Sequence, residues 1–295
     1  MGRYDNLRLI QQLDPVRDHH RIHRISIGYE FPWDTLRANE LALLRVYCIP
    51  TISALLDRTG EFRVRTQKRY DDSVLTLYEI AKHGYDSERG RAAIRRMNRI
   101  HHYFTISNED YLYTLSTIVF EPIRWNARFG WRPLCQHEKL AAHYFWREVG
   151  RRMNIVGIPE TMEEFEHFSR EYERAHFRYT DESRRVGIAT RDLILSWYPR
   201  PARPAMTPWL YALIDEDMLD CFGFPHPPQA MRRALELSLR TRGRLVRFLR
   251  ARRAPRFFVD DPNRTYPNGY DISDFGPPAL RDELNRREHA RAAGL

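Results

Sequence analysis

Helical spacing of apolar residues runs through almost the whole of this chain and limits its possible folds more than any other feature. Apolar residues recur three and four positions apart, whereas the alternating pattern of a half-buried strand is rare. Turn signals such as Gly157-Ile158-Pro159 separate the segments. The segments predicted to be helical are Leu36–Leu56, Thr66–Lys82, Glu88–Phe104, Asp110–Arg128, His137–Met153, Met162–His176, Thr180–Trp197, Trp209–Cys221 and Gln229–Arg250. The sequence therefore predicts an all-α protein.

The connections between these segments are short, and no linker divides the chain. We therefore expect one compact multi-helix bundle. Hydrophobic residues make up 42% of the 295 residues, which is enough for a large core. The expected organisation is a single domain over residues 1–295, with a helical core of about 36–251 and an irregular tail at 252–295. Cys48, Cys135 and Cys221 are far apart and lack metal-ligand spacing, which favours free thiols in a reducing compartment.

Positive charge is concentrated between Gln229 and Arg256, where Glu236 is the one acidic residue. The arginines of this segment are Arg232, Arg233, Arg240, Arg242, Arg244, Arg247, Arg250, Arg252, Arg253 and Arg256. Their excess equals the +9 net charge of the whole chain, so the remainder is balanced and a nucleic-acid partner is not expected. Leu235, Leu239, Val246 and Leu249 give the segment an apolar face, which fits a helix on an anionic membrane or on the protein core.

The N-terminal stretch from Met1 to His23 is charged and lacks the apolar region of a signal peptide. No stretch approaches the roughly 18 uncharged apolar residues that a spanning helix needs. These features predict a cytoplasmic protein whose contact with a membrane, if any, is peripheral.

His101 is the first candidate functional residue. Ile94, Met97, Ile100 and Phe104 form one apolar stripe at about 100° per residue, and His101 falls inside it. His102 lies about 100° away, toward one edge of the stripe. An imidazole in an apolar stripe needs a hydrogen-bond partner or a metal ion, so a satisfied core histidine and a metal ligand both remain open.

The preceding helix supplies a second candidate. Arg69, Ser73 and Thr76 line up along one edge of its buried stripe. An arginine at such an edge often extends to solvent or pairs with a surface carboxylate. A fixed guanidinium beside a hydroxyl is also suited to a bound oxygen species or a carboxylate. The spacing alone does not separate these two interpretations.

An ordered series of short motifs extends from Lys68 to Pro159, and further motifs lie near both ends of the chain. It consists of Lys68-Arg69-Tyr70-Asp71-Asp72-Ser73, Arg95-Arg96-Met97-Asn98-Arg99-Ile100-His101-His102, Glu121-Pro122-Ile123-Arg124-Trp125, Phe129-Gly130-Trp131-Arg132-Pro133, Met153-Asn154-Ile155 before Ile158-Pro159, Tyr266-Pro267-Asn268-Gly269-Tyr270, and Leu13-Asp14-Pro15 with Phe31-Pro32-Trp33. In order and spacing this series resembles the family that contains the MpaB-type oxygenases and the latex clearing protein, a rubber oxygenase. The resemblance spans most of the chain.

The resemblance implies a globin-like helical core that binds haem b. In the rubber-oxygenase branch, a histidine after an arginine-rich turn is the proximal iron ligand, and this position falls on His101. The family's distal Arg-x-x-x-Thr pair falls on Arg69 and Ser73, and serine keeps the hydroxyl group. The rubber enzymes have a lysine before the threonine that can cap the iron, whereas this chain has Asp72, a carboxylate able to move a proton.

These observations together predict a haem-dependent oxygenase that uses dioxygen on a hydrophobic or lipid-like substrate. Oxidative cleavage of an isoprenoid carbon–carbon double bond to carbonyl products is the candidate reaction. In this prediction His101 holds the iron, while Arg69, Ser73 and Asp72 act on the distal side. The alternatives are a haem protein that senses a ligand without turnover, and a helical protein that binds an anionic membrane or nucleic acid through its arginine-rich segment.

Overall fold

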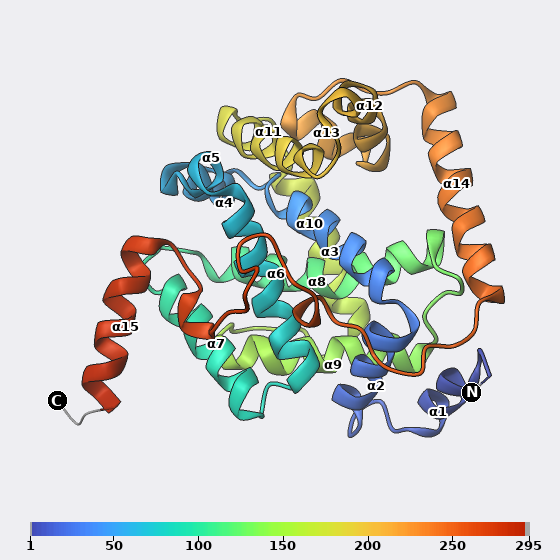
Figure 1. Ribbon diagram of the computed structural model, residues 1–295, viewed down its shortest axis with the longest axis horizontal. Helices are drawn as coiled ribbons and strands as arrows, with labels where there is room; N and C mark the ends of the chain where they lie inside the picture. The colour runs from blue at the N-terminus through green and yellow to red at the C-terminus, as the bar shows by residue number, and fades with distance from the viewer. Residues whose placement is uncertain (1, 293–295) are drawn as a thin grey trace.

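The all-α prediction is confirmed in the computed structural model, which describes residues 2–292 and has no strand among them (Figure 1). The α-helices are α1 (Asp5–Gln12), α2 (His19–Ile25), α3 (Pro32–Val46), α4 (Pro50–Thr59), α5 (Glu61–Val64), α6 (Thr66–His83), α7 (Glu88–His101), α8 (Asn108–Phe129), α9 (Gln136–Arg152), α10 (Met162–His176), α11 (Asp181–Ser196), α12 (Arg203–Leu213), α13 (Glu216–Phe222), α14 (Gln229–Phe248) and α15 (Pro278–Ala292). Short helical turns occur at Ser26–Glu30 (η1, a π-helix) and at Arg200–Ala202, Phe258–Asp260 and Ile272–Asp274 (η2, η3 and η4, 3₁₀-helices).

The long helix α8 runs through the middle of the molecule and contacts α3, α9, α10 and α14 (Figure 1). A large core forms where α6, α7, α8 and α9 meet, with Leu75, Val119 and Phe145 fully or almost fully buried. A second core lies where the end of α3 meets α11 and α13, around Ile49 and Phe222. The stripe-forming segments of the sequence therefore bury their apolar faces against one another, as helical periodicity predicts.

The predicted helix Leu36–Leu56 is wrong, because the chain breaks between α3 and α4. Pro50 has no backbone N–H and disfavours the helical conformation of the residue before it. Ile49 accordingly has an extended backbone, with φ −87° and ψ 118°. The predicted helix Trp209–Cys221 is likewise divided into α12 and α13.

The predicted limits of the helical core, about 36–251, also need correction. Two further helices, α1 and α2, precede it, and residues 252–295 are not irregular throughout. Pro277-Pro278 looks like turn material in the sequence, but Pro278 is the first residue of α15. Proline is well suited to that position because its fixed φ matches a helix and its missing N–H would have no intrahelical partner there.

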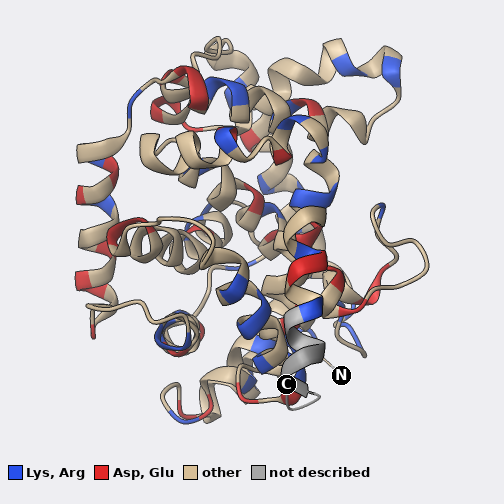
Figure 2. Ribbon diagram, turned by 90° about the vertical axis from the view of Figure 1, so that its left-hand side faces the viewer, with Lys and Arg blue, Asp and Glu red and all other residues tan. Residues whose placement is uncertain are grey.

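Within the described residues, no single helix is long and apolar enough to cross a membrane. Together α3 and α4 meet the length and composition requirements, but they are bent by 96° at their junction. Figure 2 shows the side of the molecule that carries α15, where both acidic and basic residues are scattered over the helices. This distribution agrees with the balanced charge expected outside the arginine-rich segment.

Candidate active site

A cavity of about 290 Å³ lies between α4, α6, α7, α8 and α9, and the C-terminal tail closes part of it. Most of its wall is apolar, with residues such as Leu56, Met97, Leu115 and Val149. All four candidate residues from the sequence line this cavity, namely Arg69, Asp72, Ser73 and His101. The helical fold thus brings together side chains that are 32 positions apart in the chain.

His101 is the last residue of α7 and lines the cavity beside Tyr111, whose ring centroid is 5.4 Å from that of the imidazole. Its Nδ1 atom is buried and has no hydrogen-bond partner among the described residues. Burial lowers the pKa of His101 to about 4, and the positive charge of Arg69 contributes to this shift. A helix C-terminus favours a charged histidine, so burial outweighs that effect and the imidazole is neutral at physiological pH.

The neighbouring His102 is exposed and does not line the cavity. The two adjacent histidines therefore have different environments, as the position of His101 in the apolar stripe predicts. A satisfied core histidine would have hydrogen-bond partners for its buried ring nitrogens, and Nδ1 of His101 has none in the described part of the chain.

Arg69 lies on α6 near His101, and its guanidinium donates a hydrogen bond to the Ser73 hydroxyl. Ser73 in turn donates to the Arg69 carbonyl oxygen at 2.7 Å. No carboxylate among residues 2–292 forms an ion pair with Arg69, unlike the nearby pair Lys68–Asp72. The interpretation of Arg69 as a surface ion-pair partner is therefore not supported, and its charge is directed to the cavity.

Asp72 is buried, and both of its carboxylate oxygens already accept hydrogen bonds. The donors are the Lys68 ammonium at 3.0 and 3.1 Å, the Tyr266 hydroxyl at 2.7 Å and the Gly276 amide at 2.9 Å. Two of these donors belong to the C-terminal tail. The contacts of Asp72 therefore indicate that it holds the tail on α6, which differs from the proton-moving role expected from the sequence.

The tail and Lys68 are parts of the site that sequence reasoning missed. Phe275, Gly276 and Pro277 form a piece of the cavity wall. Gly276 has φ +108°, a conformation that favours glycine, and a Cβ there would meet Ile100 at 3.0 Å. Lys68 precedes Asp72 by one helical turn on α6. The i, i+4 spacing of these opposite charges could have predicted their ion pair from the sequence.

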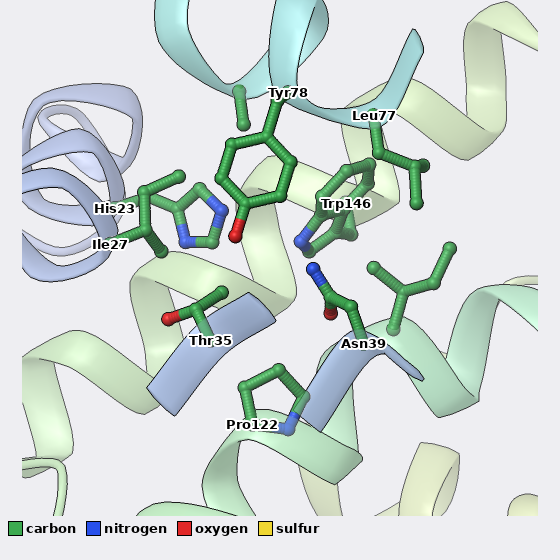
Figure 3. A pocket seen from close by; sticks show the side chains of 10 residues that line it. His23, Ile27, Thr35, Asn39, Leu77, Tyr78, Pro122 and Trp146 are labelled. Carbon is green, nitrogen blue, oxygen red and sulfur yellow. The ribbon is translucent and has the colours of Figure 1, made fainter. Parts of the chain in front are cut away.

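A much smaller chamber of about 20 Å³ lies next to this cavity, and Leu77, Ile118 and Trp146 line both. Figure 3 shows the side chains of His23, Asn39, Tyr78 and Trp146 pointing into it from α2, α3, α6 and α9. The Tyr78 hydroxyl and the Asn39 carbonyl oxygen are buried without a hydrogen-bond partner among the described residues. Burial also lowers the pKa of His23 to about 3, so its ring is neutral.

Residues 41–257 match the family described as the catalytic domain of ER-bound oxygenase mpaB/B' and rubber oxygenase. The chain belongs to this oxygenase family. It is 28% identical over 214 residues to an ER-bound oxygenase mpaB of Penicillium roqueforti, a match that covers 66% of this chain and 72% of that protein. Two Penicillium brevicompactum proteins, named ER-bound oxygenase mpaB' and mpaB, are 26% and 32% identical over 75% and 58% of this chain. Those two matches cover only 56% and 49% of the relatives' own lengths.

Membership of the mpaB and rubber-oxygenase family confirms the resemblance inferred from the ordered motifs and classes the chain as an enzyme, an oxidoreductase. The family match includes α6 and α7, and thus Arg69, Ser73 and His101, but it ends before the tail segment that closes the cavity. Within the described residues, no three His, Cys, Asp or Glu side chains are grouped to hold a metal ion. A haem needs only one protein side chain as an axial ligand, so a haem site does not require such a group of three.

Proposed function

We propose that this chain is a haem-b-dependent oxygenase that acts on a hydrophobic substrate. The observation that carries the proposal is the juxtaposition of His101 and Arg69 in one largely apolar cavity. Haem b, when bound, supplies the iron chemistry that activates the co-substrate dioxygen. The candidate reaction is oxidative cleavage of an isoprenoid double bond to carbonyl products.

The residues of the cavity fit a haem in three respects. His101 is kept neutral by burial, and a neutral imidazole is the form that ligates a metal. Its Nδ1 is buried and has no hydrogen-bond partner in the described part of the chain, unlike the nitrogens of a satisfied core histidine. The wall is mostly apolar, as a macrocycle and a hydrophobic substrate both require. His101 would therefore hold the haem.

Arg69 has donor groups for the oxygen co-substrate, and Ser73 holds Arg69 in place. Because Arg69 lacks an ion-pair partner among the described residues, its N–H groups are available to interact with negative charge that develops on oxygen. Ser73 shares one turn of α6 with Arg69 and orients the guanidinium through their hydrogen bond. Leu56, Leu115 and Val149 would exclude water and bind the substrate through the hydrophobic effect.

Oxygen consumption tests the proposal. The purified holoprotein, mixed with a polyisoprenoid olefin such as squalene and an electron donor, should consume dioxygen and form carbonyl products. A matched saturated hydrocarbon should not support this uptake, because it has no double bond to cleave. A protein that retains haem but consumes no dioxygen with any olefin would be a sensor, and a protein without haem would contradict the proposal.

A further inference from the structure

The arginine-rich helix α14 has an inner face that anchors it to the body of the protein. Gly243 packs so closely on the end of α8 that a Cβ there would lie 2.5 Å from the Phe129 carbonyl oxygen. Arg242 pairs with Asp34 at 2.5 Å and stacks over Trp33 at 3.9 Å. Leu235, Leu239 and Val246 are partly buried on this same side. The apolar face expected from the sequence is therefore largely the one that packs inward.

The opposite side of α14 carries a second apolar stripe, which is exposed. Its members recur at spacings of three and four, which places them along one line of the helix: Ala230, Ala234, Leu237, Thr241, Leu245 and Phe248. Leu237, Leu245 and Phe248 have 61%, 62% and 84% of their surface exposed. Figure 1 shows α14 at the outer edge of the molecule, where nothing in the described chain covers this stripe. Grouped apolar side chains on a surface indicate a contact with another apolar phase.

A row of arginines follows one edge of that stripe. Arg233, Arg240, Arg244 and Arg247 are all exposed and extend over about 21 Å of helix. Arg240 pairs with Glu236 at 2.9 Å, and Arg247 donates to the Tyr4 hydroxyl at 2.9 Å. Arg233 and Arg244 form no ion pair with a described residue. The stripe and this row together are called the outer face of α14.

We propose that the outer face of α14 docks the protein on an anionic lipid bilayer. The exposed leucine and phenylalanine side chains enter the boundary between headgroups and acyl chains, and the arginine row pairs with negatively charged headgroups. A nucleic-acid duplex satisfies the arginines but offers its charged backbone to the exposed Leu237, Leu245 and Phe248. The combination of a continuous apolar stripe with a one-sided basic edge therefore favours lipid.

Vesicle flotation of the full-length protein tests this proposal without any measurement of oxygenase activity. The wild type should float with vesicles of phosphatidylcholine and phosphatidylserine at low salt, and much less with phosphatidylcholine alone. The double variant Arg233→Gln/Arg244→Gln should lower the partition coefficient by roughly fivefold for each arginine, since each basic residue contributes about 1 kcal/mol near such a surface. The double variant Leu245→Ser/Phe248→Ser should lower partitioning to both kinds of vesicle.

A matched control removes the same charge from elsewhere. Arg63 and Arg91 are exposed, lie on α5 and α7, and form no ion pair with a described residue, so Arg63→Gln/Arg91→Gln should float like the wild type. All variants change exposed side chains and should keep the wild-type melting temperature. The proposal is overturned if the wild type does not float with anionic vesicles, or if the control loses as much binding as the outer-face variant. It is also overturned if the outer-face variants keep their binding to vesicles and lose only their binding to duplex nucleic acid.

Discussion

Among single residues, Arg69 acts in the proposed chemistry and not in folding. Replacement of Arg69 by alanine should leave haem binding and the melting temperature nearly unchanged, because Arg69 has no ion pair to lose among the described residues. The rate per bound haem should fall because the activation free energy rises by about 2–4 kcal/mol, the range for removal of a donor to a developing oxyanion. Ser73→Thr keeps the hydroxyl and should be tolerated. A lower melting temperature with an unchanged rate would instead make Arg69 a structural residue.

Tyr78 tests whether the small chamber holds water. Its volume of about 20 Å³ is enough for roughly one molecule, and the Tyr78 hydroxyl and Asn39 carbonyl oxygen lack other partners in the described chain. If a water bridges them, Tyr78→Phe should lower the free energy of unfolding by about 1 kcal/mol, the usual contribution of a hydrogen bond. If the chamber is dry, the same change removes an unsatisfied polar group and should stabilise the protein. Urea unfolding distinguishes the two signs.

At the scale of structural elements, Asp72 connects α6 to the C-terminal tail. Asp72→Ala leaves the Lys68 ammonium without its buried carboxylate and removes acceptors from Tyr266 and Gly276. The expected loss of stability is about 3–5 kcal/mol, as for other broken buried pairs. Limited proteolysis should then cut the tail near Arg264 faster than in the wild type. The exposed control Asp217→Ala should show neither effect, and a stable, protease-resistant Asp72→Ala variant would refute this role.

Apolar periodicity predicted some of the helices correctly and failed for others. It located α6 to α11 because each has one apolar stripe and clear turn signals at its ends. It joined α3 to α4 because the stripe continues through Pro50, although proline cannot donate the required backbone hydrogen bond. The tail wall at Phe275–Pro277 was not predictable, since its position depends on contacts with Asp72 and Arg96 that are about 180 to 204 residues away in sequence.

At the scale of the whole molecule, buried neutral histidines make stability depend on pH. The pKa of His23 is about 3 in the folded protein, below the value of about 6.5 in an unfolded chain. Between these values the unfolded chain binds one more proton, so stability from His23 is present above pH 6.5 and is lost as the pH falls.

The measurement is urea unfolding of the wild type and of His23→Phe at pH 6.5 and 5.5. The wild type should lose about 1 kcal/mol more than His23→Phe over this unit of pH, because the unfolded histidine is already half protonated at pH 6.5. His102→Gln changes an exposed histidine and should keep the wild-type slope. Equal slopes for the wild type and His23→Phe would show that folding does not lower the pKa of His23.

The candidate site as a whole was predicted more fully by the ordered motifs than by periodicity. Helical spacing placed His101 in an apolar stripe and Arg69 at a stripe edge, but it did not show that the two helices share a cavity. The resemblance singled out both residues, and the fold places them together. The exposed stripe of α14 was missed because periodicity identifies an apolar face without showing which of two faces meets the core.

Haem binding by His101 is measured by the absorption spectra of three purified proteins. The wild type, reconstituted with haem b, should show a full Soret band, and His102→Ala should match it because His102 is exposed and outside the cavity. His101→Ala should lose the band while its circular dichroism keeps the helical signal. A full Soret band in His101→Ala, together with its loss in His102→Ala, would show that His102 and not His101 binds the haem.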